Sequence, residues 1–161
     1  MKADGSRMDV GSSGNGFAWL FFKCSSLTRA PDLPATQLTT RCYINMFYML
    51  GVNTALTSVP SILPATTLPN ECYRGMFTYC SAITDAPYLP AKTTGSMSYG
   101  WMFDSCSALS SMHVGLSAWP SGGTNTWLAY VAPNGVFTCP AELPDRRGSS
   151  NIPTGWTKVD A

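Results

Sequence analysis

The amino-acid sequence predicts one repeat domain of the α/β class. We expect a right-handed solenoid with parallel strands on one side, short helices or turns on the other, and a C-terminal β-hairpin cap. The solenoid is indicated by a sequence frame that occurs four times, and by a helix-like spacing that alternates with a proline-containing, strand-like segment in each copy. An Asn-Gly pair between two β-rich runs near the C-terminus predicts the hairpin.

The repeat is clearest in residues 72–91, which follow the pattern Cys-Tyr-x-x-Met-Phe-x-x-Cys-Ser-x-Ile-Thr-x-Ala-Pro-x-Leu-Pro-Ala. Its Phe occurs at intervals of 26, 30 and 26 residues, at Phe21, Phe47, Phe77 and Phe103. The long interval reflects insertions in the second copy. A nearly fixed period of this size is typical of arrays whose copies bury their apolar residues against each other.

The first half of each copy has the spacing of one helical face. Cys42 and Met46 are four residues apart, as are Tyr43 and Phe47, which predicts a helix of two turns or fewer. Its N-cap oxygen would come from the polar residue two positions before the Cys, as at Thr40 and Asn70.

The second half of each copy excludes a helix. Leu27, Ala30 and Leu33 recur irregularly, and Pro31 and Pro34 cannot lie inside one. A short strand that continues as an extended segment fits better, and stacked copies would form a narrow parallel sheet. We expect two internal rows, one of the four repeat Phe residues and one of Leu27, Leu56, Ile83 and Leu109.

These patterns divide the chain into three parts. Residues 1–16 are rich in Gly and Ser and predict a flexible lead-in. Residues 17–120 form the four-copy solenoid, and the period ends after Pro120. Residues 121–161 form a capping region, in which residues 127–131 and 136–139 flank Asn134-Gly135 as the hairpin.

The order Met-Phe-x-x-Cys-x-x-Leu, followed by a Leu-Pro strand end, resembles the leucine-rich repeats of the Bacteroides surface antigen A (BspA-like) type. The variant with CYxxMF and APxLPAT is similar to proteins of gut Bacteroidales, their phages and their mobile elements. The resemblance runs from Phe17 to Leu116, and departs from the family at Ser98 and His113. It implies a leucine-rich-repeat solenoid at a cell surface, outside the cell or on a virion. The chain starts without the apolar core of a secretion signal, so it is either not exported in that way or a fragment.

Composition excludes several classes of partner. Charged residues make up 12% of the chain and the net charge is +1, so we expect no nucleic acid and no anionic membrane as a partner. No run of about 18 apolar residues occurs, so we expect no membrane insertion.

The sequence predicts no catalytic centre, metal site or cofactor. The chain has one His, and Asp32, Asp85 and Asp104 fall in separate copies. Cys24, Cys80 and Cys106 share a repeat position that Leu50 occupies in the second copy, while Cys42 and Cys72 share another with Ser98. Such interchange favours buried free thiols over disulfides or metal ligands.

A binding surface is the remaining candidate. Between the core positions of the strand segments, residues of differing chemistry occupy a constant frame: Arg29, Asp32, Ser58, Ser61, Asp85, Tyr88 and Ser111. The alternative interpretation is that these positions are merely solvated. Trp101 and Trp119 are candidates for a sugar- or protein-binding patch.

We therefore expect a non-enzymatic recognition module of a bacterial surface protein, which binds a host or cell-surface protein or glycan. The alternatives are a phage tail-fibre or receptor-binding component, and a structural spacer without its own ligand.

Overall fold

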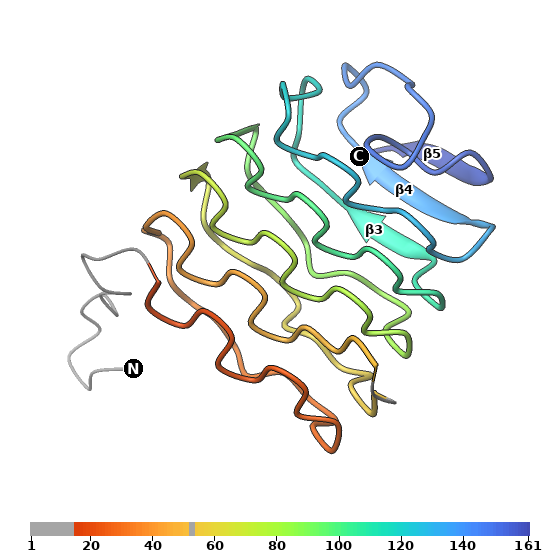
Figure 1. Ribbon diagram of the computed structural model, residues 1–161. Helices are drawn as coiled ribbons and strands as arrows, with labels where there is room; N and C mark the ends of the chain where they lie inside the picture. Colours follow the sequence, from red (N-terminus) through yellow and green to blue (C-terminus); the bar gives the residue numbers. More distant parts are fainter. Residues whose placement is uncertain (1–14, 52–53) are drawn as a thin grey trace.

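The computed structural model describes residues 15–51 and 54–161. Successive copies of the repeat run side by side across the molecule, from the first copy (red) to the C-terminal strands (blue) (Figure 1). The predicted lead-in, residues 1–16, lies outside the described residues except for Asn15 and Gly16.

The described residues contain no helix and five short strands. Two strands, β1 (Thr67–Leu68) and β2 (Thr93–Thr94), form a parallel pair. The other three, β3 (Ser111–His113), β4 (Gly135–Cys139) and β5 (Trp156–Asp160), form a parallel sheet in the order β3-β4-β5. The predicted fold class, a right-handed α/β leucine-rich-repeat solenoid with a β-hairpin cap, is therefore wrong.

Backbone hydrogen bonding explains why the helix-like segments are not helices. In the second copy, the N–H groups of Cys42, Ile44 and Met46 donate to the carbonyl oxygen three residues earlier. The N–H groups that alternate with them donate instead to the next copy, as Tyr43 does to Cys72 at 3.0 Å and Phe47 to Met76 at 2.9 Å. In an α-helix, each of several consecutive N–H groups donates a hydrogen bond to a carbonyl oxygen of the same helix. Because every second amide bonds to a neighbouring copy, the segment forms a series of turns.

These turns require left-handed backbone at every fourth residue. Arg41 and Asn45 have φ values of 61° and 51°, and each is the third residue of a turn closed by an N–H to carbonyl bond. A positive φ at that position is the mark of a type II turn. The next copy has the same arrangement at Glu71, Gly75 and Tyr79. The four-residue repeat of the turns gives the same spacing of apolar residues as a helix.

The predicted N-caps are wrong for the same reason. The side-chain Oδ1 of Asn70 accepts the backbone N–H of Ser96 at 2.9 Å, which belongs to the next copy. The oxygen therefore joins two copies and begins no helix.

The core consists of rows of like side chains, one from each copy. The predicted Phe row is confirmed: Phe21, Phe47, Phe77 and Phe103 stack with ring centroids 5.2, 5.2 and 5.4 Å apart. The last three are fully buried, while Phe21 is half-buried at the end of the row. In the second predicted row, Leu56, Ile83 and Leu109 are fully buried and Leu27 is half-buried.

A further aromatic row lies beside the Phe row. It contains Phe17, Tyr43, Tyr73, Tyr99 and Trp127, with ring centroids 5.7–6.1 Å apart. Since Trp127 belongs to the predicted capping region, side-chain stacking continues past Pro120. Backbone bonds continue too, from Phe103 N–H to Trp127 and from Ser105 N–H to Ala129.

The predicted hairpin is therefore wrong. Of the predicted first strand, residues 127–130 lie in turns that bond to the fourth copy, and β4 pairs in parallel with both of its neighbours. Gly135 is required by packing, because a Cβ there would overlap the carbonyl oxygen of Ser110 and come within 2.7 Å of the Trp156 ring. The Asn-Gly pair begins a strand and does not reverse the chain.

Candidate binding surfaces

The proline-containing segments lie side by side and carry two rows of outward side chains, which we call the strand-side face. In the first row Arg29 pairs in parallel with Ser58, and Asp85 with Ser111. Ser111 pairs in turn with Val136 of β4. Backbone bonds such as Ala30 N–H to Ser58 O at 2.9 Å hold these segments together. The backbone positions from which these side chains project are therefore fixed.

The second row is more apolar. Ile62 pairs with Tyr88, and His113 pairs with Thr138. The rings of Tyr88 and His113 link the two pairs, with centroids 4.3 Å apart and planes tilted by 32°. Ile62 and His113 are exposed and Tyr88 is half-buried. This row offers an aromatic patch beside the polar first row.

The structure brings most of the sequence-predicted binding residues together. Arg29, Asp32, Ser61 and Asp85 are exposed, and Ser58, Tyr88 and Ser111 are half-buried. Ser61 contributes its carbonyl oxygen to the Tyr88 N–H at 2.9 Å. Asp32 is in neither paired row. The Asp85 carboxylate accepts a hydrogen bond from the Thr84 hydroxyl at 2.7 Å, which fixes its direction.

The cysteines are all free thiols, and five of the six are buried. Cys24 is exposed, contrary to the prediction that it belongs to the core. The S–H groups of Cys80 and Cys106 donate to the carbonyl oxygens of Phe47 and Phe77 at 3.1 and 3.0 Å, so each links its copy to the preceding one. Burial raises the pKa of Cys42 to about 11 and that of Cys80 further, which keeps both thiols protonated.

The predicted equivalence of Leu50 with these cysteines is wrong. Leu50 is 44% exposed, whereas its neighbour Met49 is fully buried. Met49 therefore supplies the buried side chain after Phe47 in the second copy.

A second surface is a cavity of about 330 Å³ over the turns, which we call the turn-side cavity. Four aromatic residues and one charge of each sign contribute to its lining, which comprises Trp19, Asn45, Tyr48, Arg74, Gly75, Thr78, Tyr79, Trp101 and Asp104. None of these belongs to the strand-side face. Among the predicted candidates, only Trp101 lies here.

Charges of the turn-side cavity have defined partners. Arg74 Nη1 lies 2.7 Å from Glu71 Oε2, and its guanidinium lies 4.7 Å from the centre of the Trp101 ring. Glu71 Oε1 also binds Arg41 at 2.8 Å, and these hydrogen bonds lower the pKa of Glu71. Partial burial raises the pKa of the Asp104 carboxyl, and hydrogen bonds from the Ser105 hydroxyl, at 3.5 Å, and from the Ser105 backbone oppose that shift.

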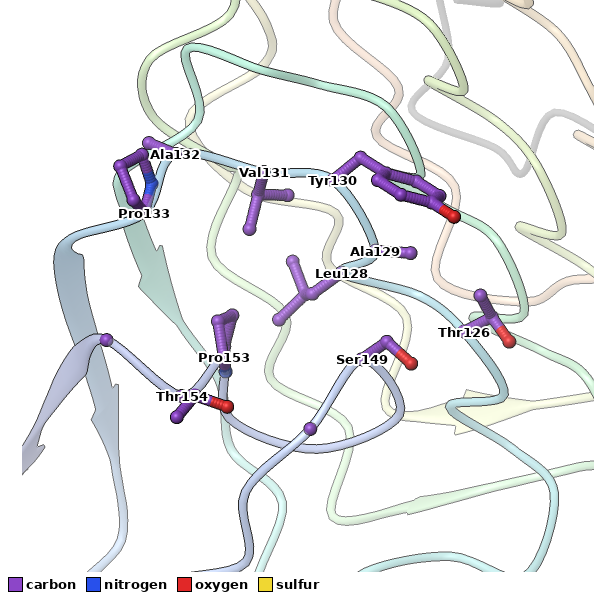
Figure 2. A pocket seen from close by; sticks show the side chains of 12 residues that line it. Thr126, Leu128, Ala129, Tyr130, Val131, Ala132, Pro133, Ser149, Pro153 and Thr154 are labelled. Carbon is purple, nitrogen blue, oxygen red and sulfur yellow. The ribbon is translucent and has the colours of Figure 1, made fainter.

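A second cavity, of about 500 Å³, lies near the C-terminus. Figure 2 shows Leu128 and Val131 on one side and Pro153 and Thr154 on the other. No charged residue lines it, and Tyr130 at its edge is 81% exposed. Trp119 is half-buried and lines a separate cavity with Arg146.

Sequence reasoning missed most of the turn-side cavity, although the repeat contains a signal for it. Most of its lining residues stand either two positions before the repeat Phe or one position after it, as Asn45 and Tyr48 do around Phe47. Aligning the copies on Phe would have shown Trp19, Trp101 and Asp104 in the same two columns.

Among residues 15–51 and 54–161, no three His, Cys, Asp or Glu side chains gather where they could hold a metal ion. Within the same residues no helix is long and apolar enough to cross a bilayer.

Comparison with protein-family models, with curated proteins and with solved structures found no match to this chain.

Proposed function

We propose that this chain is a non-enzymatic recognition module that binds a host or cell-surface protein or glycan through its strand-side face. The observation that carries the proposal is the pair of rows described above, in which side chains of differing chemistry stand on hydrogen-bonded parallel backbone. Such a frame reduces the entropy lost on binding, because the backbone of the contact residues is already ordered.

The chemistry of the rows suits recognition. Tyr and Arg are the residues that most often dominate binding interfaces, and the face presents Tyr88 beside His113 and Arg29 in the polar row. The lone His packs against a Tyr ring, which favours a contact role over a catalytic one. The proposed setting, a bacterial surface or a phage particle, comes from the sequence resemblance.

The experiment begins with a screen of the purified chain against arrays of glycans and host cell-surface proteins. Arg29→Ala, Asp85→Ala and Tyr88→Ala are then combined and measured against the partner that the screen identifies. We expect weaker binding with an unchanged melting temperature, because these side chains stand outside the core. Tyr130→Ala is the control, since Tyr130 is exposed elsewhere and should not alter binding.

Salt dependence gives a second test. With a net charge of +1, affinity should change little between low and physiological salt.

Undiminished binding by the triple variant would remove the strand-side face from the proposal. If the chain bound nothing on either array and did not bind intact bacterial cells, the spacer interpretation would replace it. Binding to bacterial cells alone would favour the phage component.

A further inference from the structure

The turn-side cavity has the size and walls of a small-ligand site. Its volume of about 330 Å³ lies at the lower end of the range of about 300–1,000 Å³ that is usual for such sites. Trp19, Tyr48 and Tyr79 follow one another along it, with successive ring centroids 5.9 Å apart and successive ring planes inclined by 56° and 71°. Trp19 is 47% exposed, so an apolar face is open to solvent. Each ring has an electron-rich face, which can accept the C–H groups of one ligand face.

The polar groups of the cavity include both donors and acceptors. Asn45 and the two tyrosine hydroxyls can donate and accept, Arg74 donates, and the Asp104 carboxylate accepts. A hydroxyl group both donates and accepts, so a polyhydroxylated ligand can pair with this mixed set. Ligands of one charge sign fit less well, since an anion would meet Asp104 and a cation would meet Arg74.

The walls are fixed by contacts between copies. The Thr78 hydroxyl donates to the Trp101 carbonyl oxygen at 2.6 Å, which ties the third copy to the fourth beneath the cavity. Gly75 leaves room for the Asn45 amide, because a Cβ at that position would overlap Asn45 Oδ1. Arg74 is held from one side by Glu71 and from the other by the Trp101 ring. The site is therefore organised before a ligand arrives.

We propose that the turn-side cavity binds a neutral saccharide of one or two units, with its C–H face against the Tyr79 ring and its hydroxyls paired with Asp104 and Asn45. This site is independent of the strand-side face, since the two share no residue. It adds a small-carbohydrate site to a chain whose proposed main partner binds elsewhere.

The probes are glucose, galactose, mannose, N-acetylglucosamine and lactose, with tetramethylammonium chloride and inorganic phosphate as charged alternatives. Saturation-transfer-difference NMR and tryptophan fluorescence should show saturable binding of at least one sugar, with the largest transfer to ring C–H protons. Neither charged probe should compete.

The variants Tyr79→Leu and Asp104→Asn should each weaken sugar binding about tenfold, as expected for the loss of a ring face or of a hydrogen bond to a charged group. Tyr88→Leu is the matched control, because it makes the same substitution on the strand-side face and should leave sugar affinity unchanged. Circular dichroism checks that all three fold.

Three results would overturn the proposal: no sugar binds, Tyr79→Leu and Asp104→Asn both bind as the parent does, or tetramethylammonium or phosphate binds where sugars do not. Loss of sugar binding in Tyr88→Leu alone would place the sugar on the strand-side face and also refute the assignment. Because the array screen and the sugar titration use different variants, either proposal can fail without the other.

Discussion

Phe77→Ala tests whether the stacked rings hold the copies together. Phe77 is fully buried between Phe47 and Phe103, with centroids 5.2 and 5.4 Å away. Truncating a buried Phe costs about 3–5 kcal/mol. Each stacked pair is worth about 0.5–1.5 kcal/mol beyond area burial, so the loss of two pairs puts the cost near the upper end. For a chain of this length, a loss of about 4–5 kcal/mol lowers the melting temperature by about 8–20 °C.

The matched control is Phe21→Ala, at the end of the same row. Phe21 is half-buried and stacks on one described ring, so its loss should cost only about 1–2 kcal/mol. Urea unfolding followed by circular dichroism gives both free energies. Equal costs for the two variants, or a Phe77→Ala protein that melts within a degree or two of the parent, would refute the stacking argument.

Three further predictions concern thiols, charge and backbone. Ellman's reagent should modify one thiol in the native protein, Cys24, and all six after unfolding; rapid modification of more than one would contradict the buried positions of the others. Glu71→Gln should destabilise the protein at neutral pH. The folded-state pKa of Glu71 is depressed, so the stability that its ionised carboxylate contributes is fully present above its ordinary pKa of 4.5. That contribution disappears as pH falls through the lowered value. The unfolding curves of variant and parent should therefore converge in strong acid. Gly75→Ala should destabilise the protein by about 1 kcal/mol or more, because φ is 62° and the added methyl group overlaps the Asn45 amide. Adding Asn45→Ala should relieve part of that cost. Additive effects in the double variant would disprove the overlap.

The frame of the fold could be predicted from the sequence because it depends on period alone. Phe47, Phe77 and Phe103 recur at matching positions, and side chains at matching positions of adjacent copies must meet if the copies lie side by side. The rows containing Phe77 and Ile83 follow from that rule without knowledge of the backbone conformation.

The backbone conformation itself could not be predicted, because its cause is non-local. Cys42 and Met46 have a helical spacing, but the intervening amide of Tyr43 bonds to a residue of the next copy. A local pattern cannot show where that amide donates. The same holds for Asn134-Gly135, where the glycine makes room for the Trp156 ring.

The candidate sites divide in the same way. Arg29 and Asp85 could be predicted because, in an extended segment, polar residues that stand between apolar core positions point outward. Tyr48, Tyr79 and Asp104 were missed because the predicted helix assigned them no common surface. The four-residue repeat of the turns is what places them around one cavity.

The alternating hydrogen bonds predict that neighbouring amides exchange hydrogen for deuterium in different events. The three intervals between the repeat Phe residues are even numbers, so the alternation keeps its parity from copy to copy. In residues 17–24, 41–49, 71–80 and 97–106, the amides that donate hydrogen bonds to the next copy belong to odd-numbered residues, as at Phe21 and Phe77. The amides that close turns within a copy belong to even-numbered residues, as at Met46 and Met76. A copy that separated from its neighbour while keeping its own shape would expose only the odd set to deuterium. Complete unfolding would expose the odd-numbered and the even-numbered amides alike. A hydrogen-exchange experiment would therefore distinguish separation of intact copies from complete unfolding by whether the even-numbered amides also exchange.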